Sequence, residues 1–148
     1  MKMPDPVIPT DIPEEEMPSL LVNWHLGPPA RRHMSRRRFS KVAAGLEGIE
    51  GGGVLDVGCG WGYNLFLLRE LGFDPVGIDI VQNDFPAALR IAKANGVGLK
   101  LVGADVGALP FAEGSFRAVT SVETMEHVYR EDRERAFREM ARVLEPGG

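Results

Sequence analysis

Short apolar runs alternate with amphipathic stretches from residue 54 onward. The apolar runs predict four strands, at 54–57, 75–79, 99–102 and 116–122. Apolar residues at helical spacing predict helices at 63–71, 86–95 and 132–144. Strands separated by helices are typical of right-handed crossovers, so the pattern predicts an α/β fold with a doubly wound parallel sheet.

Helix boundaries and one inward helix face can also be expected from the sequence. Pro86 falls in the first turn of the second helix and Gly96 just past its end, which are favoured positions for these residue types. In the last helix we expect five apolar side chains to face the sheet: Ala136, Phe137, Met140, Val143 and Leu144.

The first 50 residues differ from the rest in composition. Residues 1–27 contain repeated prolines and the acidic run 14–16, so we expect an extended arm without a helix or a central strand. Residues 28–50 predict a basic helix that starts at two prolines and turns four apolar side chains to one side: Phe39, Val42, Ala43 and Leu46. The remaining residues, 51–148, form the expected main domain.

The basic helix carries a cluster of cationic side chains: Arg31, Arg32, Arg36, Arg37, Arg38 and Lys41. One interpretation is a solvated helix face. The other is a lid that offers arginines to an anionic substrate, because the guanidinium fork suits phosphate or carboxylate. Trp24 and His25, just ahead of the helix, could contribute to such a lid.

Bulk properties narrow the class of protein. The chain has 148 residues, of which 44% are apolar, enough for one domain with a real core. A net charge of −4 disfavours a large nucleic-acid surface. Cys59 is the single cysteine, which excludes an intrachain disulfide. Because we find neither a signal peptide nor an apolar run long enough for a membrane span, we expect a cytoplasmic protein.

The first predicted strand runs into a glycine-rich loop with the pattern Asp56-x-Gly58-x-Gly60-x-Gly62. Glycines let the backbone turn sharply and approach a ligand, and free amides at the following helix attract anionic groups. A tight turn without a ligand is the alternative. A dinucleotide-binding motif would place its third glycine at position 63, which is Tyr63, so the spacing disfavours a nicotinamide-dependent dehydrogenase.

Two acids follow the next predicted strands. Asp79 ends the second strand, 17 residues beyond Gly62, where a carboxylate can accept hydrogen bonds from ribose hydroxyls. Asp105 follows the third strand and could accept a hydrogen bond from an adenine amine. Because parallel strands open on one edge of the sheet, we expect both acids to meet the glycine loop there.

Taken together, these motifs resemble the class I S-adenosylmethionine-dependent methyltransferases, particularly the small-molecule group that includes quinone-biosynthesis enzymes. Further matching stretches are 77–80, 104–106, 109–116 and 140–148, so the resemblance covers roughly residues 50–148. It implies a Rossmann-like sheet in the order 3-2-1-4-5-7-6, of which this chain would hold the first four strands in the order 3-2-1-4. Arg117 departs from the family, which usually has Asp at that position.

The resemblance also implies S-adenosylmethionine as the cofactor and a set of binding residues: Asp56, Gly58, Gly60, Asp79, Ile80, Asp105 and Val106. The two glycines would line the methionine part, and Asp56 would hold the loop and face the ammonium group. Asp79 would bind the ribose and Asp105 the adenine amine, while Ile80 packs on adenine and the Val106 amide lies beside it.

The segment after the fourth strand supplies candidate bases or orienting groups. Methyl transfer needs alignment of the nucleophile, and a base only when the nucleophile carries a proton. Glu123, Glu126 and His127 are available, and we favour Glu123 and His127 as candidate catalytic residues. The alternative is that Glu126 and His127 only cap and pack the next segment. The three histidines show no metal-ligand spacing, so we expect no metal site.

Three functions remain open at this stage. The leading one is transfer of a methyl group to a small molecule. The second is a cofactor-binding or scaffold fragment without turnover, because strands five to seven are missing; the third is a nicotinamide-dependent dehydrogenase. The missing strands would leave the fourth strand as an open edge carrying Ala118, Val119 and Val122, so we expect self-association through it.

Overall fold

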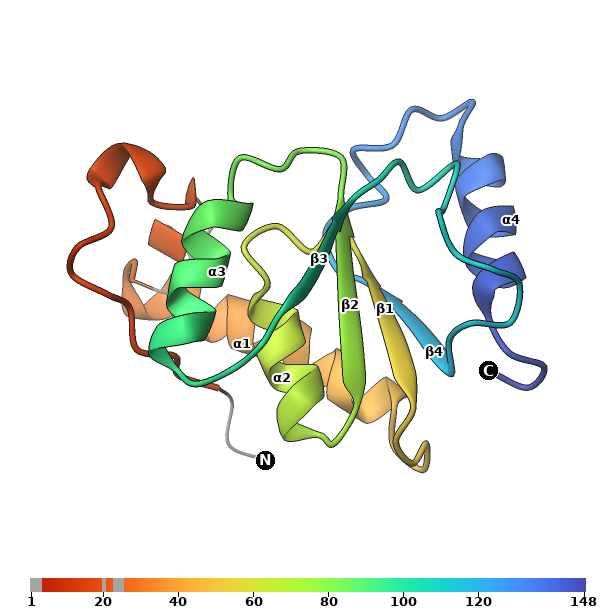
Figure 1. Ribbon diagram of the computed structural model, residues 1–148, viewed down its shortest axis with the longest axis horizontal. Coiled ribbons are helices and arrows are strands. Elements are labelled where there is room, and N and C mark those ends of the chain that lie inside the picture. Colours follow the sequence, from red (N-terminus) through yellow and green to blue (C-terminus); the bar gives the residue numbers. More distant parts are fainter. Residues whose placement is uncertain (1–3, 20, 23–25) are drawn as a thin grey trace.

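The computed structural model describes residues 4–19, 21–22 and 26–148 and shows a parallel sheet in the order β3-β2-β1-β4 (Figure 1). The strands are β1 (Gly53–Val57), β2 (Asp74–Asp79), β3 (Lys100–Gly103) and β4 (Ala118–Ser121). β1 lies at the centre and pairs with β2 on one side and β4 on the other. The predicted fold class and strand order are confirmed.

Helices cover both faces of the sheet. They are α1 (Pro29–Gly45), α2 (Tyr63–Glu70), α3 (Phe85–Ala94) and α4 (Arg133–Val143), with α4 alone on its side in Figure 1. Alternate residues of β1 supply the two halves of the core. Val54 packs with Leu65 and Leu68 of α2, whereas Leu55 and Val57 pack with apolar side chains of α4. This two-residue alternation explains why the whole of β1 is apolar apart from Asp56.

The inward face of α4 was predicted only in part. Ala136, Met140 and Val143 are buried, and their spacing of four and three residues keeps them on one helix face. The prediction for Phe137 was wrong, since its side chain is 56% exposed. Phe137 follows Ala136 directly and is therefore turned about 100° around the helix axis, away from the sheet.

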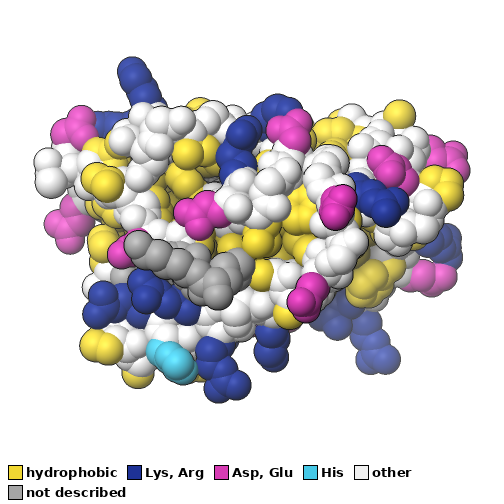
Figure 2. Space-filling model, turned by 90° about the horizontal axis from the view of Figure 1, so that it is seen from below, with side chains coloured by type: hydrophobic (Ala, Val, Ile, Leu, Met, Phe, Trp, Pro, Cys, Tyr) yellow, Lys and Arg dark blue, Asp and Glu magenta, His cyan; other side chains and the backbone are white. Residues whose placement is uncertain are grey.

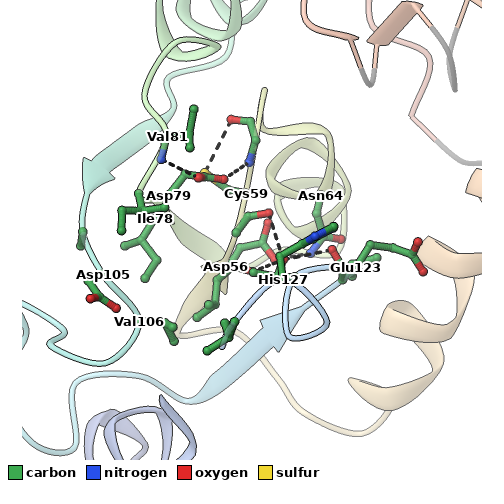
Figure 3. Close-up of a pocket in the computed structure, with 18 of the residues that line it drawn as sticks. Asp56, Cys59, Asn64, Ile78, Asp79, Val81, Asp105, Val106, Glu123 and His127 are labelled. Carbon is green, nitrogen blue, oxygen red and sulfur yellow. Dashed lines mark hydrogen bonds between the residues drawn. The ribbon is translucent and has the colours of Figure 1, made fainter. Parts of the chain in front are cut away.

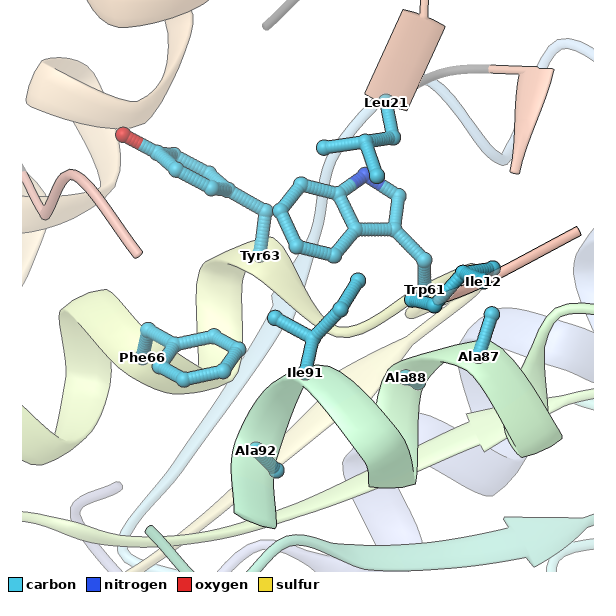
Figure 4. Packing of buried hydrophobic residues seen from close by; sticks show 9 residues of the cluster. All are labelled: Ile12, Leu21, Trp61, Tyr63, Phe66, Ala87, Ala88, Ile91 and Ala92. Carbon is cyan, nitrogen blue, oxygen red and sulfur yellow. The ribbon is translucent and has the colours of Figure 1, made fainter. Parts of the chain in front are cut away.

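The N-terminal segment is packed against the domain. Glu14–Glu16 form a 3-10 helix, so the expectation that this segment contains no helix was wrong there. The backbone N–H and C=O of Val7 bond to the side chain of Asn95, both at 2.8 Å. Ile12 and Leu21 are buried against Trp61 and the apolar face of α3 (Figure 4). Apolar burial by these two side chains holds the segment in place.

The outer edge of β4 is covered at its beginning. Phe116 forms a parallel bridge with Leu144, and its backbone bonds to Val143 and Glu145, both at 2.9 Å. The expectation that the fourth strand meets nothing on its outer side was therefore wrong at Phe116. Ala118–Ser121 pair with β1 alone within the described part of the chain.

Candidate functional site

A cavity of about 700 Å³ opens where the carboxyl ends of the strands meet (Figure 3). Its lining includes all seven residues predicted to bind a cofactor and both candidate catalytic residues: Asp56, Gly58, Gly60, Asp79, Ile80, Asp105, Val106, Glu123 and His127. Residues from three strand ends, the glycine loop and the segment after β4 thus meet in one place. Open α/β sheets bind ligands at this edge.

The glycine loop turns through left-handed backbone conformations. Gly58, Gly60 and Gly62 have φ values of 73°, 51° and 86°. Amides of Gly58 and Cys59 donate to the Ile78 carbonyl at 2.8 and 2.9 Å, which fixes the loop to the end of β2. Glycine adopts these φ values without steric cost, so the motif is required by the turn itself.

Asp79 joins the end of β2 to this loop. Its Oδ2 accepts a hydrogen bond from the Gly60 amide at 3.0 Å, and its Oδ1 accepts one from the Val81 amide at 2.9 Å (Figure 3). A carboxylate offers about four acceptor positions, so each oxygen can accept a further hydrogen bond from a ligand in the cavity. The two amides orient the carboxylate before any ligand arrives.

Asp56 lies at the centre of a buried polar cluster. Its side chain is 2% exposed, and its Oδ1 accepts hydrogen bonds from Asn64 Nδ2 and Thr120 Oγ1, both at 2.8 Å. Burial is the main reason that the pKa of Asp56 rises from its usual 3.8 to about 6. Asn64 Oδ1 is buried without a hydrogen-bond partner. A cationic donor in the cavity would compensate both the buried charge and this unpaired oxygen.

The cavity also combines an acid with an exposed apolar side chain. Asp105 Oδ1 accepts from the Gly107 amide at 2.8 Å, and its Oδ2 lies 3.7 Å from Arg135 Nη2. Ile80 is 68% exposed and lines the cavity, and Val106, which also lines it, is half-buried. An acceptor next to exposed apolar surface suits a planar ring that carries an amine.

Glu123 and His127 lie on the loop that follows β4. Glu123 has a left-handed backbone, with φ of 57°, and its Oε1 lies 3.2 Å from Arg38 Nε of α1. The side chain extends toward α1, away from Asp56 and Asp79 (Figure 3). His127 is exposed at the cavity, and its backbone N–H donates to the Thr124 carbonyl at 2.9 Å.

Several residues of the site were missed from the sequence. Thr120 and Thr124 reach it through contacts with residues more than 50 positions away, and such contacts leave no local pattern. Arg135 looked like an ordinary surface cation, and Arg38 was considered only as one member of the basic cluster. Asn64 alone left a signal, because it is a polar residue in the otherwise apolar first half of α2.

The basic helix contributes to both surface and site. Figure 2 views the molecule from below and shows Lys and Arg side chains gathered along the lower edge of the face in view. On α1, Arg31, Arg32, Arg37 and Lys41 are exposed, whereas Arg36 also lines the cavity. Trp24 and His25, expected to support a lid, lie outside the described residues. Among described residues, no cluster of three His, Cys, Asp or Glu could hold a metal ion, and no helix is long and apolar enough to cross a membrane.

Known proteins are similar to this chain in sequence and in fold. The chain is 39% identical over 98 residues to norajmaline N-methyltransferase of Rauvolfia serpentina, covering 64% of this chain and 32% of that protein. It is 34% identical over 135 residues to 2-methyl-6-phytyl-1,4-hydroquinone methyltransferase of Synechocystis sp., covering 84% and 42%. The chain thus spans about a third to two fifths of the length of these relatives.

A solved structure gives the same result for the fold. The PH0226 protein of Pyrococcus horikoshii superposes with a TM-score of 0.71 at 29% identity, covering 78% of this chain and 55% of that one. The sequence model of the methyltransferase domain matches residues 54–148, which is more than half of the chain. That stretch holds the glycine loop, the cavity residues Asp79 and Asp105, and the loop after β4. On these grounds the chain belongs to the class I S-adenosylmethionine-dependent methyltransferase family.

Proposed function

We propose that this chain binds S-adenosylmethionine and is the cofactor-binding region of a cytoplasmic methyltransferase that acts on a small molecule. The observation that carries the proposal is the meeting of the glycine loop, Asp79 and Asp105 in one cavity. A net charge of −4 argues against nucleic acid as the acceptor. S-adenosylmethionine supplies an electrophilic methyl group on its sulfonium.

The cavity residues divide the work of holding this cofactor. The bare backbone at Gly58 and Gly60 gives the methionine part close access, and Asp56 with Asn64 Oδ1 faces the ammonium group. Asp79 takes the ribose hydroxyls, with its carboxylate already oriented by two amides. Asp105 accepts from the adenine amine. These roles agree with the donor and acceptor character of each group.

Adenine would rest on the exposed Ile80 side chain, with the Val106 amide at its edge. Glu123 and His127 lie on the loop after β4 and would orient the acceptor; a base is needed only if the acceptor carries a proton. Glu123 and His127 are separate from the acids assigned to the cofactor, so the wall that they form remains for the second substrate.

A second candidate is a cofactor-binding or scaffold fragment without turnover. The chain spans a third to two fifths of the length of the curated relatives, and the cavity proposed for the cofactor lies within that span. Among the described residues Ala118–Ser121 pair with β1 alone, so their outer backbone groups can pair with another strand, including one from a second copy of the chain.

Two measurements test the proposal. Titration calorimetry should detect binding of S-adenosylmethionine and S-adenosylhomocysteine but not of NAD. Transfer of a labelled methyl group to a panel of small molecules then separates an enzyme from a binding fragment. Binding of NAD in place of S-adenosylmethionine would contradict the cofactor assignment, and binding without transfer to any acceptor would favour the second candidate.

A further inference from the structure

Glu123 is the only described residue other than glycine with a positive φ, at 57°. A side chain with a Cβ atom rarely adopts this conformation, because the Cβ comes too close to the backbone carbonyl. Such strain persists only where the surroundings hold the residue in place, and it concentrates at functional sites. The contacts around Glu123 show what holds it.

The hydroxyl of the next residue, Thr124, lies among three backbone carbonyls. Its Oγ1 is 3.1 Å from the oxygen of Val57, 3.2 Å from that of Val122 and 3.5 Å from that of Gly58. The Val57 contact fastens the loop to the end of β1. The Val122 contact spans Glu123, since it joins the residues on either side of it. A hydroxyl carries one proton, so the shortest contact is the best donor geometry.

Thr124 also fits against the glycine loop with no room to spare. A Cβ atom at Gly58 would lie 2.0 Å from Thr124 Oγ1, so only glycine leaves space for this side chain. The first glycine of the loop is therefore needed by Thr124 as well as by the turn. On the far side, Arg38 of α1 holds the Glu123 carboxylate at 3.2 Å.

We propose that Thr124 is a positioning residue whose hydroxyl holds Glu123 in its left-handed conformation, so that its carboxylate reaches α1 and closes one wall of the cavity. The glycine loop, the loop after β4 and α1 are thereby fixed to one another. The role given to Glu123 toward the acceptor rests on the proposed function, whereas the mechanical link does not.

Paired substitutions measure the strain at position 123. Glu123→Gly and Glu123→Ala both remove the carboxylate, but only Ala keeps the cost of a positive φ. We expect the Gly variant to melt roughly 2–4 °C above the Ala variant. Glu126, three residues on in the same loop and without a positive φ, provides the matched control. There the Ala variant should be at least as stable as the Gly variant.

The positioning role of Thr124 is tested by comparing the Gly and Ala variants of position 123 in chains that also carry a substitution at Thr124. In Thr124→Val, which removes the hydroxyl at nearly constant size, the stability advantage of Gly at position 123 should disappear; in Thr124→Ser it should remain. The Val background should also weaken S-adenosylmethionine binding about tenfold or more through the loop at Gly58, and Ser should restore it.

Each outcome has a distinct meaning. An unchanged advantage of Gly in the Thr124→Val background would overturn the positioning role of Thr124. Loss of the advantage in Thr124→Ser as well would show that the methyl group or the packing, and not the hydroxyl, holds Glu123. Failure of the wild-type chain to bind S-adenosylmethionine would contradict the proposed function and leave the melting comparison readable.

Discussion

Ionisation of the buried Asp56 side chain lowers the stability of the folded protein at neutral pH. Its pKa rises from 3.8 to about 6, because burial disfavours the charged form. The folded chain therefore binds this proton more tightly than the unfolded chain. At 1.36 kcal/mol for each tenfold difference in proton affinity, ionisation of Asp56 costs about 3 kcal/mol at pH 7. The stability that the protonated Asp56 side chain contributes is therefore fully present below pH 3.8, and it is lost as the pH rises through 6.

Replacing Asp56 by Asn removes the charge and keeps the shape. The new amide oxygen can still accept from Asn64 and Thr120, so we expect a gain approaching about 3 kcal/mol at pH 7.5 and little change at pH 3.5. The assay is urea unfolding of both proteins at intervals of pH between these values. Only the difference between the two proteins is used, so the titration of groups that do not interact with Asp56 cancels.

Asp74 at the start of β2 is the matched control. It is exposed, and its hydrogen bond to Lys100 lowers its pKa, so its contribution to stability has the opposite sign and is lost as the pH falls. Asp74→Asn should therefore change the stability curve in the opposite direction. An Asp56→Asn variant that is less stable than the wild type at pH 7.5, or that keeps the wild-type pH dependence, would refute the reasoning.

Three further predictions concern binding and assembly. Asp79→Ala should weaken S-adenosylmethionine binding by about 1.5–3 kcal/mol in calorimetry, whereas Asp74→Ala, at the other end of the same strand, should leave it unchanged; equal effects would remove Asp79 from the site. Gly60→Val should abolish binding because φ is 51° there and a branched side chain would enter the cavity, and normal binding by a folded variant would make the loop a purely structural turn. The free edge at 118–121 should cause concentration-dependent association in light scattering, and a monomer at all concentrations would contradict it.

The sequence was sufficient for the parts of the fold that depend on local pattern. Pro86 and Gly96 bracket α3 because each residue has a strong preference for its end of a helix. The cavity acids could be located because parallel strands end at the same edge of a sheet. Phe137 was misplaced because periodicity alone cannot distinguish the centre of a helix's apolar face from its margin.

The polar cluster beneath the cavity could not be predicted in the same way. Asp56, Asn64 and Thr120 meet only after three elements have packed, so none of them has a partner within its own segment. The same holds for the N-terminal segment, where Arg90 of α3 reaches Asp11 at 3.0 Å and Glu16 at 3.3 Å. A proline-rich composition predicts an extended backbone but not the surface on which it lies.

The central place of β1 has a consequence for the order in which the chain can fold during synthesis. β1 can pair with β2 once residue 79 has left the ribosome, but its other neighbour, β4, is complete only at residue 121. At roughly 5–20 residues per second, the delay is about 2–8 s. During that time the most apolar strand of the sheet exposes one unpaired edge, which is open to pairing with another chain.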